Sequence, residues 1–461
     1  MTSGSPIFPI TRDTDWHGRR VTVMGLGSFG GGIAVVRFFA ERGARVLVSD
    51  RKDESALAES IASLADLAGV EYRLGSNEWS HVENAELVIV NPAVPPSDVI
   101  YRRLMTSGIP CSTEIGLFWQ LNRSRVIGVT GSNGKSTTTA LTHHVLDASL
   151  ATGRAWLGGN IGGSLLLRLD EIQPEDWVVL ELSSFQLKAL DRIKARPDVA
   201  VVTNFAPNHL DWHGTLDDYR ESKQALLRWQ TEDDFCVLTP GEVVADWPSQ
   251  AQRIHAGNPE LPPMRLRGNH NRENAINAVS AVTAAMLIDA RDRGESKPSP
   301  VALTALSTFL PLPHRLASIA AAAGRTFYDD SIATTPESAI AALNSFDEPI
   351  VLLAGGSDKK LDLSEFAAAI AKSVKAVALL GTTGPKLDEL ISARNPGLVR
   401  LQADSLRSAF DWAVAQSSPG DVVLLSPGCA SLDWFRNFKD RGEQFTKLAT
   451  DWCDRLSSGA P

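Results

Sequence analysis

Residues 126–139 read V-I-G-V-T-G-S-N-G-K-S-T-T-T. An apolar run, typical of a buried strand, ends in a glycine loop, and a helical pattern follows a lysine and four hydroxyl residues. Gly131 and Gly134 let the backbone curl so that its N–H groups face a phosphate, and the N-terminus of the helix adds partial positive charge. Lys135 can reach the β- and γ-phosphates, and Ser136 can ligate Mg²⁺. This stretch predicts a strand–loop–helix site for a nucleoside triphosphate, most simply ATP.

The loop departs from the strict eight-residue phosphate-binding pattern, because Val129 stands where that pattern has glycine. The alternative interpretation is a glycine turn before a helix, followed by a chance lysine.

Composition narrows the class of protein. A chain of 461 residues indicates two to four domains, and a hydrophobic content of 43% is normal for a globular protein. The net charge of −9 argues against nucleic acid or an anionic membrane as partner. Four cysteines without a C-x-x-C pair fit a reducing compartment and no thiolate metal site. With no visible signal peptide and no apolar run of about 18 residues, we expect a cytoplasmic protein.

Three blocks of the chain alternate strand-like and helical patterns, which is typical of α/β domains built on parallel sheets. We expect domains at 1–112, 113–311 and 312–461. The expected strands are 20–24, 45–49, 87–90, 177–181, 199–203, 326–328, 350–353, 376–380, 399–402 and 422–425. The expected helices include 215–229 and 268–285, and the segments 257–263 and 291–300 read as surface loops.

A second glycine pattern, Gly25-x-Gly27-x-x-Gly30, follows the first expected strand, and Asp50 ends the next one. This arrangement fits a dinucleotide-binding fingerprint, but its geometry suits any diphosphate, and it can also be a purely structural turn. Because a separate ATP loop is present, a nucleoside-diphosphate substrate is a simpler interpretation than a second energy cofactor. Asp50 would then accept a hydrogen bond from its ribose or base.

Three further side chains follow strand-like or helical segments of the middle block. Glu181 ends the apolar run W-V-V-L-E, where a carboxylate beside the phosphate loop is a natural Mg²⁺ ligand, although it could equally be a cap or loop acid. His209 follows another strand, and a lone loop histidine is more often polar packing. Lys223 lies on a helix, where an isolated lysine is usually a surface charge.

Eight segments, in order over nearly the whole chain, share one further pattern. They are T-G-S-N-G-K-S-T-T at 130–138, G-N-I-G at 159–162, E-L-S-S-F-Q at 181–186, N-H-L-D-W-H-G at 208–214, Y-R-E-S-K at 219–223, G-N-H-N-R-E-N at 268–274, L-P-H-R at 312–315 and L-L-S-P-G-C-A-S-L-D-W-F-R-N-F at 424–438. Together they resemble the Mur ligases, the ATP-dependent amino-acid ligases of peptidoglycan precursor synthesis. The start at Gly25–Gly30 looks like the glutamate-adding members. Folylpolyglutamate synthases share only the central and C-terminal parts.

The resemblance implies three α/β domains: an N-terminal Rossmann-like domain for UDP, a central ATPase-like domain with a parallel sheet, and a C-terminal Rossmann-like domain for glutamate. It implies ATP-dependent addition of D-glutamate to UDP-N-acetylmuramoyl-L-alanine through an acyl phosphate. It also implies two Mg²⁺ sites, a carbamylated Lys223 and a monomer. The implied catalytic residues are Lys135, Glu181, His209 and Lys223, and the implied metal ligands are Ser136, Glu181, His209 and Lys223.

The implied ligand contacts fall into two sets. The nucleotide set is Gly131, Ser132, Asn133, Gly134, Lys135, Ser136, Thr137, Asn271, Asn274, Arg315 and Asp330. The substrate set is Ser28, Phe29, Gly30, Asp50 and Arg51 at the UDP end, then Asn160, Ser183 and His209, then Thr334, Lys359, Ser431, Leu432 and Phe438 at glutamate.

The chain departs from the glutamate-adding pattern at three places. Ile332 stands where those members often carry a lysine, Thr335 replaces an asparagine, and Asn91-Pro92-Ala93 replaces S-P-G. Relatives that add L-glutamate share the form D-S-I-x-T-T-P, so L-glutamate stays the alternative substrate. Two other classes remain open: a nicotinamide dehydrogenase, which would leave Lys135 idle, and a non-catalytic nucleotide-binding protein, which would tolerate loss of His209 and Lys223.

Overall fold

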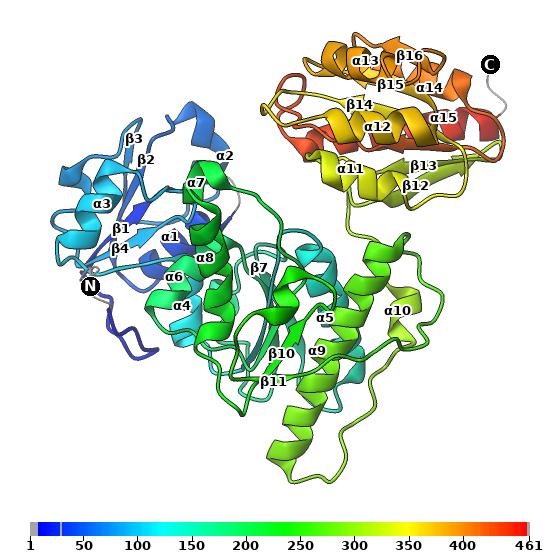
Figure 1. Cartoon of the computed structure of the whole chain (residues 1–461). Helices are drawn as coiled ribbons and strands as arrows, with labels where there is room; N and C mark the ends of the chain where they lie inside the picture. The colour runs from blue at the N-terminus through cyan, green and yellow to red at the C-terminus, as the bar shows by residue number, and fades with distance from the viewer. Residues whose placement is uncertain (1–7, 28–29, 459–461) are drawn as a thin grey trace. The chain divides into compact units, whose positions relative to one another are not determined.

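The computed structural model describes residues 8–27 and 30–458, which contain three sheets (Figure 1). The chain divides into two compact units. Unit 1 comprises Met1–Glu260 and Asn274–Leu306, and unit 2 comprises Leu261–Glu273 and Ser307–Pro461. The predicted domain boundaries near 112 and 311 stay predictions. None of the helices within the described ranges could cross a lipid bilayer.

The first sheet of unit 1 is parallel, with strand order β3-β2-β1-β4-β5. Its strands are β1 (Arg20–Met24), β2 (Arg45–Asp50), β3 (Val70–Leu74), β4 (Leu87–Val90) and β5 (Cys111–Ser112). Its helices are α1 (Gly31–Ala40), α2 (Ala58–Ala62), α3 (Val99–Thr106) and α4 (Glu114–Leu121). The sequence predicted β1, β2 and β4. Because these strands are parallel and β1 lies between the other two, their carboxyl ends lie at the same edge of the sheet.

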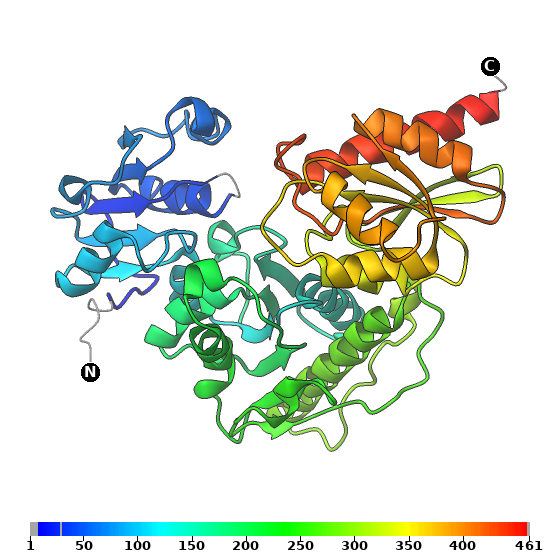
Figure 2. The same ribbon diagram turned by 45° about the horizontal axis from the view of Figure 1, so that its top comes forward.

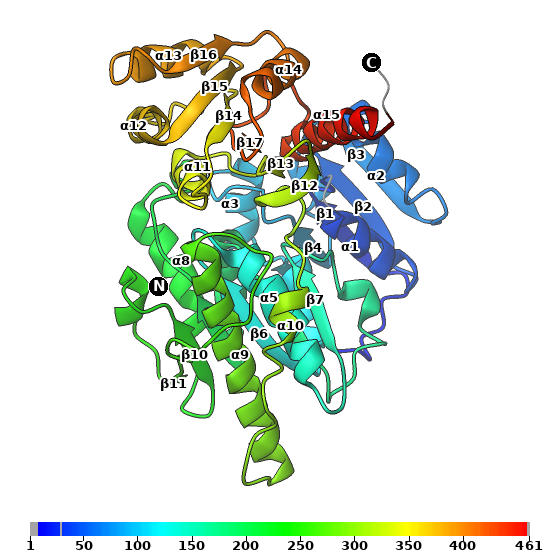
Figure 3. The same ribbon diagram turned by 90° about the vertical axis from the view of Figure 1, so that its right-hand side faces the viewer.

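The second sheet of unit 1 is also parallel, with strand order β11-β10-β9-β6-β8-β7. Its strands β6, β7, β10 and β11 are labelled in Figure 3. Its strands are β6 (Arg125–Thr130), β7 (Ala155–Gly159), β8 (Trp177–Glu181), β9 (Val199–Val202), β10 (Phe235–Leu238) and β11 (Gln252–Arg253). Its helices are α5 (Lys135–Ser149), α6 (Ser184–Arg192), α7 (Leu210–His213), α8 (Leu216–Arg228), α9 (Asn269–Arg293) and α10 (Ala305–Thr308). Short 3₁₀ turns lie at Ser55–Leu57, Trp79–His81, Leu166–Arg168 and Val243–Asp246.

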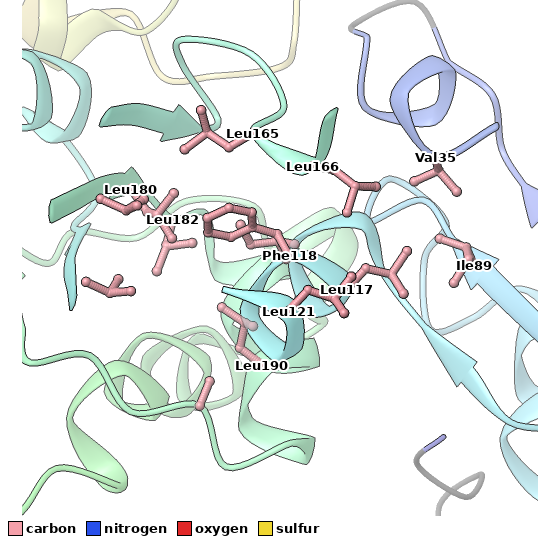
Figure 4. Packing of buried hydrophobic residues seen from close by; sticks show 14 of the residues in the cluster. Val35, Ile89, Leu117, Phe118, Leu121, Leu165, Leu166, Leu180, Leu182 and Leu190 are labelled. Atoms are coloured by element: carbon pink, nitrogen blue, oxygen red, sulfur yellow. The ribbon is translucent and has the colours of Figure 1, made fainter. Parts of the chain in front are cut away.

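One hydrophobic core joins the two sheets of unit 1, and helix α4 runs through it. The sequence E-I-G-L-F-W-Q-L is apolar on more than one face, and Thr113 caps its start by accepting from the Gly116 N–H. Figure 4 shows Leu117 on the side of Ile89, from the first sheet, and Phe118 on the side of Leu182, which follows β8. A helix that is apolar all round is buried, so α4 fixes the two sheets together.

Unit 2 holds the third sheet, with strand order β12-β13-β17-β14-β15-β16. Its strands are β12 (Ala317–Ala322), β13 (Arg325–Asp329), β14 (Ile350–Gly355), β15 (Val374–Leu380), β16 (Val399–Gln402) and β17 (Val422–Leu425). Its helices are α11 (Pro336–Leu343), α12 (Ser364–Ser373), α13 (Gly384–Ser392), α14 (Leu406–Gln416) and α15 (Phe438–Ser458).

The sheet of unit 2 is buried on both faces. Leu352 packs in a core with α11, α12 and α13, whereas its neighbours Val351 and Leu353 pack in a second core with α14 and α15. Figure 2 shows α15, in red, and α11, in yellow, on opposite sides of the sheet. Strands covered on both faces read as continuous apolar runs, which is why β14, β15 and β17 were evident from sequence.

Two expectations about the elements were wrong. The sheet of unit 2 is mixed, because β12 pairs antiparallel with β13 at the edge. Its sequence A-S-I-A-A-A is poor in strand-forming residues, so no strand was predicted there. Helix α9 runs on to Arg293, past the expected end at Ala285 and into the segment expected to be a loop. The first helix breaker is Gly294, whose φ of 66° ends the helix.

Candidate active site

The loop at 131–134 connects β6 to α5 at the centre of the second sheet, as predicted. Gly134 caps α5 with a φ of 78°, and a Cβ there would lie 2.4 Å from Asn274 Oδ1. A Cβ on Gly131 would lie 1.9 Å from Thr203 Oγ1. Lys135 Nζ donates to the Ser132 carbonyl at 2.9 Å. The loop therefore needs glycine at both positions, and its lysine folds back over it.

Residues after β9 hold this loop in place, and the sequence analysis assigned them no role. Thr203 Oγ1 donates to the Asn133 carbonyl at 2.6 Å, and Asn204 Oδ1 accepts from the Asn133 N–H at 2.8 Å. Ser132 Oγ donates to the Ala206 carbonyl at 2.8 Å. The available signal was position, because T-N-F-A follows directly on β9, which lies beside β6.

Glu181 ends β8 beside the phosphate loop, where the strand register pairs it with Val129. Its side chain is buried, and Oε1 accepts from Asn160 Nδ2 at 3.2 Å. No group within the described part of the chain makes a hydrogen bond to Oε2. A buried carboxylate oxygen without a donor is costly unless a ligand completes it. This oxygen is a fitting Mg²⁺ ligand.

Lys223 is buried rather than exposed, so the surface-charge interpretation is wrong. Its Nζ donates to the Gly131 carbonyl at 2.6 Å, which brings α8 onto the phosphate loop. Burial, and then the charge of Lys135, lowers the pKa of the Lys223 ammonium well below its usual value, against the opposing charge of Glu181. The structure thus gathers Lys135, Glu181 and Lys223 around one loop.

His209, Ser183 and Asn274 lie on the elements around this loop. His209 caps α7 with a φ of 54°, unusual for a residue with a Cβ, and its ring is exposed. Ser183 caps α6 by accepting from the Gln186 N–H. Asn274 Oδ1 accepts from Thr138 Oγ1 at 3.1 Å, beside the loop. Asn271 belongs to unit 2 and donates to the Arg267 carbonyl at 2.7 Å.

Among residues 8–27 and 30–458, no three His, Cys, Asp or Glu side chains cluster as a ready metal site. The predicted set has only two such side chains, Glu181 and His209, with the Ser136 hydroxyl and Lys223. Mg²⁺ usually keeps waters and takes phosphate oxygens together with one or two carboxylates. The donors present therefore fit Mg²⁺ brought in with a nucleotide.

The three glycines of the pattern after β1 have left-handed conformations, with φ of 91°, 66° and 88° at Gly25, Gly27 and Gly30. Asp50 Oδ2 accepts from the Leu26 N–H at 2.8 Å and from the Gly27 N–H at 3.3 Å. The aspartate therefore braces this loop, a structural role that the fingerprint alone does not reveal. Ser28 and Phe29 lie outside the described residues.

Two further residues complete this edge of the first sheet. Arg51 pairs with Asp98, which caps α3. Asn91, at the departure from S-P-G, packs against Gly25, where a Cβ would lie 2.8 Å from the Asn91 Cβ. The predicted UDP-end residues that the structure describes thus gather at the carboxyl ends of β1 and β2.

In unit 2, the predicted site residues gather at the carboxyl ends of β13, β14 and β17, which are neighbouring strands. The Gly428 N–H donates to the Ala333 carbonyl at 2.9 Å, which joins the loop that carries Thr334 to the loop that carries Ser431 and Leu432. The Ser357 N–H donates to the Ala430 carbonyl at 2.9 Å, which joins the loop that carries Lys359. Arg315 directly precedes Leu316, whose N–H donates to Asp330 Oδ1 at 3.1 Å.

Asp330 is buried, and its Oδ2 accepts from Ser426 Oγ at 2.7 Å. Burial raises the pKa of Asp330 to about 7. Arg441 was not predicted as a functional residue. Its guanidinium has no exposed surface and donates to the Ser331 carbonyl at 2.8 Å and to the Cys429 carbonyl at 3.2 Å. It fastens the Asp330 and Ser431 loops together, and nothing in its spacing gave a signal.

Comparison with known proteins decides the family. Three family models match in order: the MurD-like N-terminal domain of Mur ligases over residues 19–113, the Mur ligase middle domain over 129–259, and the Mur ligase glutamate ligase domain over 314–429. The chain belongs to the Mur ligase family. The resemblance inferred from the eight segments is confirmed.

Curated relatives match over almost their full length. The chain is 36% identical to the UDP-N-acetylmuramoylalanine–D-glutamate ligase of Symbiobacterium thermophilum, covering 93% of this chain and 97% of the relative. It is also 36% identical to the ligase of the same name from a Roseiflexus species, covering 94% and 98%. Among solved structures, MurF from Acinetobacter baumannii is 16% identical, with a TM-score of 0.54 over 89% of this chain and 91% of that one, a likeness of fold alone.

Proposed function

We propose that this chain is an ATP-dependent ligase that joins D-glutamate to UDP-N-acetylmuramoyl-L-alanine, a step of peptidoglycan precursor synthesis. The observation that best supports this proposal is the group of three side chains around the phosphate loop. Lys135 lies over the loop, Glu181 has a buried oxygen that lacks a donor, and Lys223 donates to the Gly131 carbonyl. The full-length relatives named for this reaction support the choice of substrates.

The reaction needs activation, because a carboxylate is a poor electrophile for an amine. An oxygen of the alanyl carboxylate would attack the γ-phosphorus of ATP, giving an acyl phosphate and ADP. The glutamate amine would then attack the acyl carbon, lose a proton and expel phosphate. Lys135 would meet the negative charge of the transferring phosphoryl group. The N–H groups of the loop and the start of α5 would hold the other phosphates.

Mg²⁺ would neutralise phosphate charge in this site and orient its oxygens. Ser136 and Glu181 would hold one ion beside the β- and γ-phosphates, and the free Oε2 of Glu181 is the observation that supports this. His209 would hold a second ion. Lys223 would take up CO₂ as a carbamate and so provide anionic oxygens, which suit Mg²⁺. Its lowered pKa supports this proposal, because only a neutral amine reacts with CO₂.

The remaining predicted residues would bind the other ligands. The loop after β1, with Asp50 and Arg51, would hold the UDP end. Asn160 and Ser183 would lie along the substrate, and Asn271, Asn274, Arg315 and Asp330 would contact the nucleotide. Lys359, at the third sheet, would pair with a glutamate carboxylate, beside Thr334, Ser431, Leu432 and Phe438.

ADP release tests the proposal. The purified chain receives ATP, Mg²⁺ and UDP-N-acetylmuramoyl-L-alanine, with D-glutamate, L-glutamate or no amino acid. We expect rapid ADP release with D-glutamate alone and a product heavier by one glutamyl residue in mass spectrometry. If the chain prefers L-glutamate, which the D-S-I-A-T-T segment leaves open, then L-glutamate and not D-glutamate is its substrate. Lack of release with either enantiomer would contradict the ligase assignment.

A further inference from the structure

Three side chains from three helices form a hydrogen-bonded series beside the phosphate loop, in which Ser184 and His213 are buried and the Asp218 side chain is 30% exposed. Asp218 Oδ2 lies 2.7 Å from His213 Nδ1, and His213 Nε2 lies 2.9 Å from Ser184 Oγ. The His213 side chain has no exposed surface. Ser184 is the first residue of α6, His213 the last of α7, and Asp218 lies in the first turn of α8. None of the three has a part in the proposed ligand contacts.

The direction of these hydrogen bonds follows from the groups involved. An ionised carboxylate only accepts, so His213 Nδ1–H donates to Asp218, and the neutral Nε2 accepts from the Ser184 hydroxyl. Lys188, one turn after Ser184 on α6, donates to the other carboxylate oxygen of Asp218 at 2.5 Å. Lys188 therefore links Asp218 back to α6. Both nitrogen atoms of the His213 imidazole have a hydrogen-bond partner.

The same order of residues, serine–histidine–aspartate, activates a nucleophile in many hydrolases. Here Ser184 is only 2% exposed, and the His213 ring stacks on Phe185 with centroids 5.5 Å apart. A substrate carbonyl cannot reach a hydroxyl in this position. The series is therefore better explained as a device that holds structure.

Each member is close in the chain to a predicted ligand-binding residue or to a residue that contacts the phosphate loop. Ser184 follows Ser183 and comes three residues after Glu181. The His213 N–H donates to the His209 carbonyl at 3.0 Å. Asp218 precedes Tyr219, whose hydroxyl lies 3.1 Å from Ser132 Oγ in the phosphate loop, and Lys223 follows on the same helix.

His209 itself needs such support. Its φ of 54° is a strained conformation for a residue with a Cβ, and strained residues persist only where their surroundings hold them. The segment that carries it, α7, spans only four residues, Leu210–His213. His213 is the residue through which this short segment bonds to both neighbouring helices.

We propose that His213 is a positioning residue that sets His209 and Lys223 relative to Glu181, by bonding α7 to α6 through Ser184 and to α8 through Asp218. The inference rests on the proposed function only for the identity of these three residues as Mg²⁺ ligands. Loss of the partners that orient metal ligands typically costs tenfold to a hundredfold in metal affinity or activity.

The test variant is His213→Phe, which keeps the ring and its stacking on Phe185 but removes both hydrogen bonds. The control is Gln230→Leu, which removes a buried side chain just beyond α8 that donates to the Pro197 and Phe235 carbonyls, two groups outside α6 and α7. His213→Asn and His213→Gln are each designed to restore one of the two bonds. Thermal unfolding ranks the loss of stability in all four variants.

Two experiments are made: one measures the Mg²⁺ concentration for half-maximal binding of a fluorescent ATP analogue, and the other measures the kcat and KM of ADP release. We expect His213→Phe to raise that Mg²⁺ concentration and lower kcat about tenfold or more, with partial recovery in the Asn or Gln variant and little change in Gln230→Leu. Equal losses in Gln230→Leu, or a His213→Phe variant that behaves as wild type, would overturn the proposal. The binding measurement uses only the ATP analogue and Mg²⁺, so it still tests the proposal if the chain fails to join glutamate.

Discussion

Two lysine ammonium groups donate to neighbouring carbonyl oxygens of one loop: Lys135 to Ser132 and Lys223 to Gly131. The residue pattern alone predicts a phosphate ligand at Lys135, whereas it favours a surface charge at Lys223. Burial changes the chemistry of Lys223, because a desolvated ammonium loses its proton more readily. At the scale of single residues, the two lysines should therefore respond differently to substitution.

For Lys135→Ala we expect a folded protein whose turnover falls roughly a thousandfold or more, because a cation that meets the transferring phosphate is worth several kcal/mol. ADP release measures the loss, and circular dichroism checks the fold. Lys447→Ala, on an exposed face of α15, serves as control and should change neither quantity. Near-normal turnover in Lys135→Ala would disprove the phosphate-loop assignment.

For Lys223→Ala we expect almost no turnover, partly restored by added formate or acetate. A small carboxylate replaces the anionic oxygen that the carbamate would provide to Mg²⁺. Removal of CO₂ from the buffer should slow the wild-type chain and leave the rescued variant unchanged. If Lys223→Ala turns over at the wild-type rate, the carbamate proposal is wrong.

At the scale of elements, the site depends on how loops meet at the carboxyl ends of adjacent strands. Gly134 starts α5 in a left-handed conformation, with no room for a Cβ beside Asn274. Asp330 follows β13 and reaches Ser426, which follows β17. Substitution of Gly134 or Asp330 should disturb its own helix or strand little. The effect of each substitution therefore measures the contact between two elements.

Gly134→Ala should abolish ATP binding, because the added Cβ would lie 2.4 Å from Asn274 Oδ1 and the loop must move. The matched control is Gly241→Ala, at a φ of 79° with no atom of the described chain within 4 Å of the new Cβ. Both variants share the cost of a left-handed alanine, about 1 kcal/mol, so only the clash distinguishes them. Binding of a fluorescent ATP analogue provides the measurement, and equal binding by the two variants would contradict the expected clash.

Asp330→Asn should flatten the pH dependence of stability. The folded-state pKa of Asp330 is raised to about 7, above its unfolded value, so the native state retains a proton that the unfolded chain releases. Its stabilising contribution is present at acid pH and is lost as pH rises towards 7, by about 1.4 kcal/mol per unit. Urea unfolding from pH 5 to 8 should show the wild type losing stability relative to the variant, whose amide still bonds Ser426 and Leu316. Parallel curves would exclude the raised pKa.

At the scale of the whole molecule, each of the three sheets presents one group of predicted ligand-binding residues at the carboxyl ends of its strands, as open α/β sheets commonly do. In unit 1 the two sheets share the core around α4, so the UDP-end loop and the phosphate loop belong to one folded body. This arrangement fits the proposal that unit 1 binds two different nucleotides, one at the loops of each sheet.

Binding should distinguish a UDP site from a nicotinamide site. We expect the wild-type chain to bind UDP-N-acetylmuramoyl-L-alanine in calorimetry and to show no heat with NADH. The Asp50→Ala variant should bind the UDP compound at least tenfold more weakly, because the Leu26 and Gly27 N–H groups lose the carboxylate that holds the loop. Tight NADH binding without binding of the UDP compound would overturn the assignment of the first domain.

Much of this protein could be predicted from its sequence. The strands 20–24, 87–90, 177–181, 399–402 and 422–425 have the expected bounds. Those at 87–90, 177–181 and 422–425 are buried along their whole length and read as largely apolar runs, whereas 399–402 is a partly exposed edge strand. The edge strand β12 and the last turns of α9 could not be predicted, since alanine-rich and charged segments carry no clear period. The eight motifs predicted the family, and the three family models that match along the chain confirm it.

The sequence by itself determined the glycine loops, the strand ends that carry Glu181 and Asp50, and the family, because these depend on residue type and local spacing. Tertiary structure alone decided that Lys223 is buried on the Gly131 carbonyl, that Thr203 and Asn204 hold the phosphate loop, and that Arg441 joins two loops of unit 2. It also decided that His213 bonds α6, α7 and α8 together. Most of these contacts join segments far apart in the chain, and desolvation and hydrogen-bond partners exist only once the elements have packed.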